Sequence, residues 1–156
     1  MKQIPEMTLH FAYGSNMSRA LMRRRCPGAR ALGPARLDGW RFVITRDGYA
    51  SLTRDAGAQV HGVLWRLTPR DLAALGAYEQ RAYLRRIVPA RHGAARRPAL
   101  VYLAPERGGG RARPGYQELV VASARDWKLP ENYVTTLARW IPGFHGRLGV
   151  ATGEMG

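Results

Sequence analysis

The sequence contains one cysteine and no long hydrophobic run. Because Cys26 has no second cysteine to pair with, an intramolecular disulfide is excluded and an oxidising compartment gains no support. No stretch approaches the ~18 consecutive apolar residues that a membrane-spanning helix needs, and residues 1–8 lack the apolar core of a signal peptide. We therefore expect a cytoplasmic protein without a membrane partner.

Grouped metal ligands are also missing. The four histidines lie far apart along the chain, at His10, His61, His92 and His145. None has a cluster of thiols or carboxylates beside it at the spacing that metal sites use. We expect no structural metal.

Lysines and acidic residues are few, so the chain is strongly basic. Its 25 Lys and Arg residues oppose 11 Asp and Glu residues, which gives a formal net charge of +14, and only Lys2 and Lys128 are lysines. Such a charge can attract polyanions, but the arginines are spread along the whole chain. The densest run, Arg23-Arg24-Arg25, falls at the expected end of a helix, where cations are favourable. We expect a solvated basic surface and no specific nucleic-acid partner.

A length of 156 residues suits a single domain. Hydrophobic periodicity and turn signals such as Asp38-Gly39 and Asp47-Gly48 divide the chain into short strands and helices. The expected strands are 8–13, 35–37, 40–45, 51–53, 60–67, 83–90 and 99–104, and the expected helices are 18–25, 69–78, 116–124 and 130–140. This order predicts an α+β fold in which a small mixed sheet closes toward a barrel with helices packed around it. The domain is expected over 1–143 and an irregular tail over 144–156.

The most informative segment follows the first strand, where Tyr13 leads into Gly14, Ser15 and Asn16. Gly14 permits a tight turn, and successive backbone amides before a helix form a concavity that binds a carboxylate or a developing oxyanion. The same residues also suit an ordinary connection in which Asn16 or Ser18 caps the next helix. These few residues alone leave both interpretations open.

A second informative position is Glu79, at the end of the helix expected to begin at Pro69. Glu79 lies seven residues after Leu72 and four after Leu75, so continued helical spacing directs it toward the core. Desolvation would raise the pKa of such a carboxylate toward the range useful to a general acid and base. Alternatively, the helix ends earlier and Glu79 lies in solvent or pairs with a nearby arginine.

Three segments together resemble the γ-glutamylcyclotransferase-like family. They are Phe-Ala-Tyr-Gly-Ser-Asn-Met at 11–17, similar to the family's substrate loop; the strand 60–67, the following helix and Tyr78-Glu79 with Tyr83, similar to its catalytic region; and 116–124 with Leu-Pro-Glu-Asn-Tyr at 129–133, similar to its closing helices. The resemblance covers about residues 8 to 140. Three motifs in the right order identify the chain as a member far more firmly than any one of them.

The resemblance implies a chemistry that needs no cofactor. The free α-amine of a small-molecule γ-glutamyl substrate attacks its own γ-carbonyl, forms 5-oxoproline and releases an amino acid or amine. Glu79 would be the catalytic general acid and base, and the enzyme would be a monomer or homodimer. The residues implied in substrate binding are the loop Tyr13, Gly14, Ser15 and Asn16 and the tyrosines Tyr83, Tyr116 and Tyr133.

The chain departs from the family pattern at a few positions. Many relatives have an aspartate three residues before the glutamate and a glycine after it, where this chain has Gly76 and Gln80. Glutathione-specific relatives typically carry leucine at the position of Asn16, which argues against glutathione as the preferred substrate. The alternative is a non-catalytic module on the same fold that binds a small acidic metabolite or a partner's terminus. The presence of Glu79 favours the enzyme.

Overall fold

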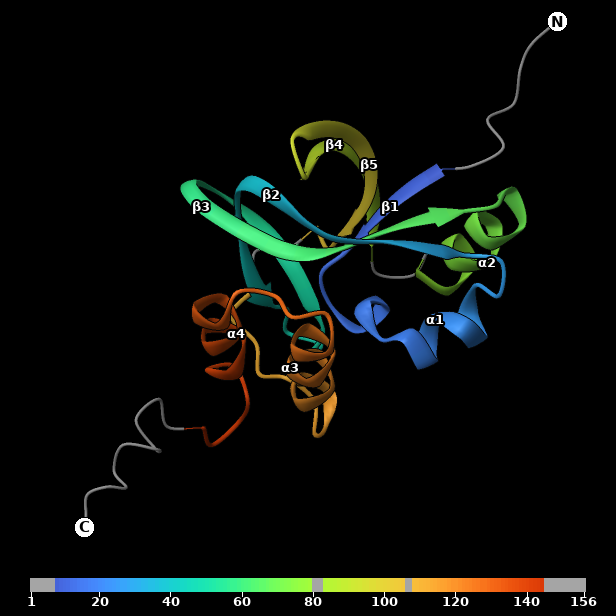
Figure 1. The fold of residues 1–156 in the computed structure, drawn as a ribbon. Helices are drawn as coiled ribbons and strands as arrows, with labels where there is room; N and C mark the ends of the chain where they lie inside the picture. Colours follow the sequence, from blue (N-terminus) through green and yellow to red (C-terminus); the bar gives the residue numbers. More distant parts are fainter. Residues whose placement is uncertain (1–7, 80–82, 106–107, 145–156) are drawn as a thin grey trace, which may run out of the picture.

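Five strands close into a barrel in the computed structural model, which describes residues 8–79, 83–105 and 108–144 (Figure 1). The strands are β1 (Thr8–Ala12), β2 (Arg30–Ile44), β3 (Ala50–Leu67), β4 (Leu84–His92) and β5 (Ala95–Leu103), in the order β1-β3-β2-β4-β5. Neighbours pair antiparallel except β1 and β5, which pair parallel at His10 and Leu100 and close the barrel. The predicted mixed barrel is therefore confirmed.

The long β2–β3 hairpin differs from the prediction of four short strands. Asp38-Gly39 does not end a strand. It forms a bulge instead, because the pairing with β3 shifts register between Asp38 and Trp40 and then continues, with Gly39 at φ 87°. A bulge bends a strand without breaking the ladder, as a closed barrel requires. The predicted turn at Asp47-Gly48 does join the two strands, and the Gly48 N–H donates to the Thr45 carbonyl at 2.9 Å.

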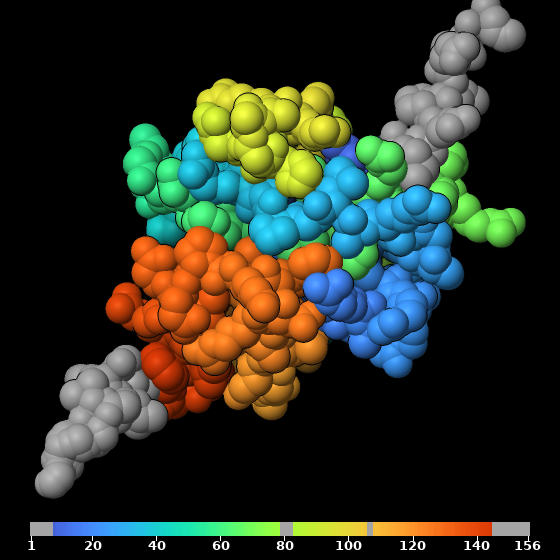
Figure 2. Space-filling view, in the orientation of Figure 1, coloured from blue at the N-terminus to red at the C-terminus, as the bar shows by residue number. Residues whose placement is uncertain are grey.

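The helices lie outside the barrel in two groups. They are η1, a short 3-10 helix (Ser15–Met17), α1 (Arg19–Arg25), α2 (Pro69–Glu79), α3 (Tyr116–Asp126) and α4 (Glu131–Ala138). In Figures 1 and 2, α3 and α4 pack together below the barrel, and α3 meets the segment of η1 and α1. The predicted helices are thus found with small shifts of their ends, whereas most of the predicted tail lies outside the described residues.

The start of α2 is fixed by a reciprocal cap. The Thr68 hydroxyl accepts from the Asp71 N–H at 3.0 Å, and the Asp71 carboxylate accepts from the Thr68 N–H at 3.2 Å. The same carboxylate accepts from the Gly28 N–H at 3.1 Å, so it joins the start of α2 to the chain just after α1. Asp71 is buried, and this capping box therefore sets where α2 lies.

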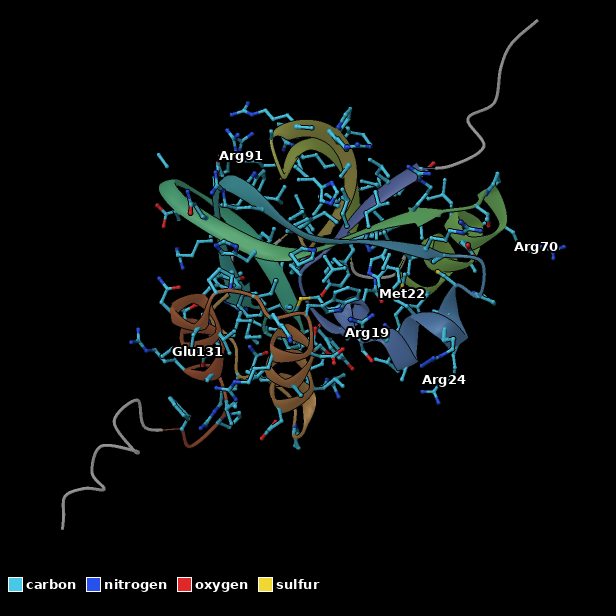
Figure 3. The ribbon with its side chains drawn as sticks, viewed as in Figure 1. Arg19, Met22, Arg24, Arg70, Arg91 and Glu131 are labelled. Carbon is cyan, nitrogen blue, oxygen red and sulfur yellow. The ribbon has the colours of Figure 1, made fainter. Side chains whose placement is uncertain are left out.

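A glycine in β3 allows the first strand to pack closely. A Cβ on Gly62 would come within 2.2 Å of the Ala12 carbonyl oxygen and 2.7 Å of the Phe11 ring. No side chain fits there, so β1 and β3 approach each other just before the Tyr13 loop. Around this core the arginines point outward, as Arg24, Arg70 and Arg91 do in Figure 3, whereas Met22 points inward. In the described ranges, no helix is long and apolar enough to cross a membrane.

Candidate functional site

A cavity of about 650 Å³ opens where β1 ends. Its walls come from segments far apart in the sequence: the loop after β1, helix α1, the β2–β3 turn, the end of α2 and the start of α3. The lining is rich in tyrosine and consists of Ala12, Tyr13, Gly14, Ser15, Asn16, Leu21, Arg25, Asp47, Tyr49, Ala50, Tyr78, Tyr83, Tyr102, Arg113, Tyr116 and Leu119.

The loop after β1 forms one wall of this cavity. Its 3-10 turn uses the N–H groups of Met17 and Ser18, which donate to the carbonyls of Gly14 and Ser15 at 3.0 and 2.9 Å. The N–H groups of Gly14 and Ser15 precede the turn and make no backbone hydrogen bond within the described part of the chain. Such amides are suited to an oxyanion or a carboxylate.

Gly14 is required by space and not by its backbone angles. A Cβ at this position would lie 2.9 Å from the Tyr116 hydroxyl and 3.1 Å from the Ala50 Cβ. The absence of a side chain therefore lets the loop lie directly against the start of β3 and of α3.

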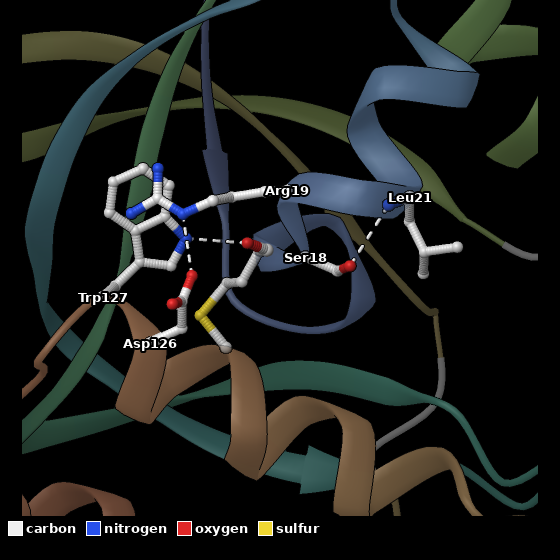
Figure 4. A network of polar contacts seen from close by, with 6 residues as sticks. Ser18, Arg19, Leu21, Asp126 and Trp127 are labelled. Carbon is white, nitrogen blue, oxygen red and sulfur yellow. Dashed lines mark hydrogen bonds and ion pairs between the residues drawn. The ribbon is translucent and has the colours of Figure 1, made fainter.

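A polar network shown in Figure 4 holds the loop on α3. The Trp127 indole N–H donates to the Met17 carbonyl at 2.8 Å, and the Arg19 guanidinium lies 3.6 Å above the Trp127 ring. Arg19 also pairs with Asp126 at 2.7 Å, and the Ser18 hydroxyl caps α1 by accepting from the Leu21 N–H. Of the residues in these contacts, Leu21 belongs to the cavity lining, and together the contacts restrict the position of the loop.

A second network fixes the side chain of Asn16. Its amide nitrogen donates to His10 Nε2 at 3.4 Å, and His10 Nδ1 donates to the Leu100 carbonyl at 3.0 Å. Because Nδ1 faces a carbonyl, it carries the proton and Nε2 accepts. Burial lowers the pKa of His10 to about 4, so the ring stays neutral and the arrangement persists at physiological pH.

Arg25 extends this network across the cavity wall. Its Nη1 donates to Asn16 Oδ1 at 2.6 Å and to the Ser15 hydroxyl at 3.1 Å, and its Nη2 donates to the Tyr78 hydroxyl at 2.6 Å. The guanidinium also lies 4.2 Å from the centre of the Tyr78 ring. One arginine therefore joins the loop after β1 to the end of α2.

Arg25 belongs to the run of arginines that was expected to be solvated, and its contact with the loop was not predicted. A signal was present, because Arg25 lies four residues after Leu21, and Leu21 lines the cavity. Residues four apart share a helix face. The neighbouring Arg24 is exposed and does not line the cavity.

Three of the predicted tyrosines line the cavity and also hold its backbone. The Tyr13 hydroxyl donates to the Tyr102 carbonyl, and the Tyr83 hydroxyl donates to the Ala50 carbonyl at 2.6 Å. The Tyr116 hydroxyl accepts from the Ala50 N–H at 3.2 Å. Tyr83 and Tyr116 thus both fix the first residue of β3, while their rings form part of the cavity wall.

Tyr133 lies elsewhere. It is buried on α4 with its ring 5.0 Å from that of His61, and it is not part of the cavity lining. Burial raises the pKa of Tyr133 and lowers the pKa of His61. The structure therefore does not bring Tyr133 together with the other predicted substrate-binding residues, and its role in substrate binding stays a prediction.

The helix that carries Glu79 continues through this residue, so the alternative in which it ends earlier is wrong. Leu75, one helical turn earlier, is fully buried, and the inward orientation of Glu79 stays a prediction. The side chain of Glu79 lies outside the described residues. The preceding residue, Tyr78, and the next described one, Tyr83, both line the cavity, so the backbone that carries Glu79 passes along its wall.

A family model described as "Gamma-glutamyl cyclotransferase, AIG2-like" matches residues 10–129. The chain belongs to this family. No curated protein matches it. The matched range holds the loop after β1, all of α2 and Tyr116, whereas Tyr133 lies beyond it.

Solved structures agree with the family. A structure described as "Gamma-glutamyl cyclotransferase" superimposes with a TM-score of 0.81 at 23% identity, covering 90% of this chain and 91% of the other. An uncharacterized protein from Homo sapiens gives 0.81 at 23% identity, with 90% and 92% covered. YkqA from Bacillus subtilis superimposes with a TM-score of 0.75 at 25% identity, and the match covers 90% of this chain and 56% of the YkqA chain. The cyclotransferase fold is thus confirmed.

Two further features concern metal ligands and the thiol of Cys26. Among the described residues, no three His, Cys, Asp or Glu side chains are placed to hold a metal ion. Burial raises the pKa of Cys26 to about 11, so its thiol is not a nucleophile at neutral pH.

Proposed function

We propose that the protein is a γ-glutamyl cyclotransferase that converts a γ-glutamyl amide into 5-oxoproline and a free amino acid or amine without a cofactor. One observation carries the proposal. The family's loop, with the N–H groups of Gly14 and Ser15, and the end of α2, at Tyr78, line one cavity and are joined through Arg25. In the proposal Glu79, the next residue of α2, supplies its carboxylate to the same space as these oxyanion donors.

The reaction needs a folded substrate more than an external nucleophile. The α-amine nitrogen attacks the γ-carbonyl carbon of its own molecule, a carbon–nitrogen bond forms, and the bond to the leaving nitrogen then breaks. Holding the chain in a near-ring removes much of the entropic barrier. The N–H groups of Gly14, Ser15 and Asn16 would donate to the oxygen that becomes negative in the tetrahedral intermediate.

Glu79 would move the protons. The α-ammonium cannot attack until it loses a proton, and the leaving nitrogen departs poorly as an anion. In the proposal the Glu79 carboxylate takes a proton from the α-ammonium and, after the attack, donates it to the leaving nitrogen. The second proton that the attacking nitrogen loses on becoming a lactam passes to the released amine, which departs as an ammonium ion, so Glu79 returns to its starting state after each cycle. A positioned acid and base of this kind accelerates a reaction about 10²- to 10⁴-fold.

The test measures 5-oxoproline release from several γ-glutamyl amino acids and amines, using the protein and its Glu79→Gln variant. We expect release by the wild-type protein and a loss of about 10²- to 10⁴-fold in kcat for the variant. Circular dichroism and thermal unfolding of the two proteins control for folding. Folded wild-type protein that releases no 5-oxoproline from any substrate would instead support the non-catalytic binding module.

A further inference from the structure

One arginine at the cavity is held in place by the β2–β3 turn. The Arg113 Nε donates to the Asp47 carbonyl at 2.8 Å, and its backbone N–H donates to the Gly48 carbonyl at 3.2 Å. Its guanidinium carbon lies 4.8 Å from the centre of the Tyr49 ring. Exposed arginines are usually mobile, whereas this one has three contacts with a single turn.

The turn itself is shaped to receive Arg113. Gly48 has φ 91°, and a Cβ there would lie 2.7 Å from the Arg113 Cγ and 3.0 Å from the Arg111 carbonyl oxygen. The side-chain stem of Arg113 therefore rests directly on the bare backbone of Gly48. The position of the guanidinium is a consequence of this packing.

The two terminal nitrogens of Arg113 remain available to a ligand. In the described part of the chain they make no hydrogen bond or ion pair, and Arg113 does not pair with the exposed Asp47 carboxylate. A guanidinium with a free edge matches a carboxylate with two parallel hydrogen bonds. Arg113 thus presents an anion-binding edge at the cavity.

Tyrosine rings connect this edge to the loop after β1. The Tyr49 ring under Arg113 packs edge-on against the Tyr116 ring, with 5.4 Å between the ring centres, and the Tyr116 hydroxyl lies 2.9 Å from where a Cβ of Gly14 would be. Arg113 is therefore two rings away from the amides of the loop. A γ-glutamyl group bound at those amides would extend its leaving group along the tyrosines toward Arg113.

We infer that Arg113 binds a carboxylate on the leaving group, so that the protein prefers γ-glutamyl amino acids over γ-glutamylamines that lack this carboxylate. The inference rests on the proposed function, because it takes the loop after β1 as the site of the γ-glutamyl group. Arg113 acts here as a specificity-determining residue. It touches the part of the substrate that departs and takes no part in the proton transfers.

The test compares two substrates that differ by one carboxylate, γ-glutamylalanine and γ-glutamylethylamide. The kcat/KM for 5-oxoproline release is measured for the wild-type protein, Arg113→Gln and the matched control Arg111→Gln, which changes an exposed arginine of the same loop outside the cavity lining. We expect the wild-type protein and Arg111→Gln to prefer γ-glutamylalanine. In Arg113→Gln the kcat/KM for γ-glutamylalanine should fall about tenfold to a hundredfold, mainly because KM rises. The kcat/KM for γ-glutamylethylamide should be unchanged.

Other outcomes overturn the inference. An equal loss on both substrates would place Arg113 on the carboxylate of the γ-glutamyl group itself, and no loss on either would leave it without a ligand. If the wild-type protein turns over neither substrate, the proposed function fails, and calorimetric titration of the same two compounds decides the inference. A preference for γ-glutamylalanine in binding that Arg113→Gln abolishes would support it, and equal affinities would overturn it.

Discussion

The two ends of the cavity are built differently. The loop after β1 is fixed by largely buried groups, with Asn16 bound to His10 and Arg25 and with Met17 bound to Trp127. The end formed by the β2–β3 turn presents two exposed side chains, Tyr49 and Arg113, and the stem of Arg113 rests on Gly48. For the proposed reaction, the rigid end suits the γ-glutamyl group, which all substrates would share, and the surface end suits the leaving group, which would vary. Changes in the loop should therefore affect all substrates alike, and changes at the turn should alter selectivity.

The largest effect is expected from Gly14→Ala, which tests the rigid end. The new methyl group would enter the space of the Tyr116 hydroxyl and the Ala50 side chain, so the loop must move away from β3 and α3. A displacement of this size at a reacting centre costs about 10²-fold in kcat/KM, and overpacking lowers the free energy of unfolding by ~1–3 kcal/mol. Kinetics on γ-glutamylalanine and γ-glutamylethylamide, and urea unfolding, measure the two quantities.

A double variant sharpens this prediction. Tyr116→Phe removes the oxygen nearest to the new methyl group, so Gly14→Ala combined with Tyr116→Phe should regain part of the stability that Gly14→Ala loses. A double-mutant cycle gives the coupling between the positions. Strictly additive losses would contradict the close contact between them, and a selective loss on one substrate would contradict the assignment of this end to the shared group.

A smaller effect is expected from Arg25→Met, which removes the link between the loop and α2 while keeping an unbranched side chain. Without the three hydrogen bonds of Arg25, the amides of the loop and the end of α2 should no longer be held at a fixed separation. We expect kcat to fall about tenfold to a hundredfold, by the same factor on γ-glutamylalanine and γ-glutamylethylamide. Arg24→Met, at the neighbouring exposed position shown in Figure 3, is the matched control and should leave kcat unchanged on both substrates.

The kcat of the folded variant decides between positioning and a purely structural role. If Arg25 only stabilises the fold, Arg25→Met should lower the unfolding temperature and leave the kcat of the folded protein intact. Arg25→Lys keeps the charge but not the forked geometry, so it should recover only part of the activity. Full activity in Arg25→Lys would show that charge alone suffices.

Sequence reasoning succeeded where the signal was local. Thr68, Pro69 and Asp71 fix the start of α2 within four residues, and the helix begins at Pro69 as predicted. The prediction was wrong where a segment distant in the sequence determines the local structure. Gly39 forms a bulge because β3 continues to pair beyond it, and a glycine with positive φ can serve a turn or a bulge equally well.

The same limit applies to the cavity. The predicted loop and two of the three predicted tyrosines outside it lie together, because the family motifs carry their spacing. Arg25 and Arg113 were not predicted as cavity residues, because in the sequence each resembles a surface arginine. Their partners, Tyr78 for Arg25 and the Gly48-Tyr49 turn for Arg113, become known only from the fold. A strongly basic composition hides such residues among many solvated ones, and only the fold separates them.

The smallest effect at neutral pH, and the one that best isolates the rigid end, concerns His10. Burial lowers its pKa from 6.5 to about 4 in the folded protein. The unfolded chain therefore takes up a proton first as the pH falls. Stability should be unaffected above pH 6.5, fall progressively below it and stop falling below about pH 4, with a total loss on the order of 3 kcal/mol.

Urea unfolding between pH 7.5 and 4 measures this dependence, with His10→Gln as the comparison. Glutamine cannot titrate, so the variant should be less stable at pH 7.5, where it loses the fitted contacts to Asn16 and Leu100, yet should lose less stability than the wild-type protein on acidification. The difference between the two curves isolates His10 from the carboxylates that also titrate in this range. Parallel curves would mean that the ring takes up its proton in the folded state, and the neutral acceptor at Nε2 would then not be what fixes Asn16.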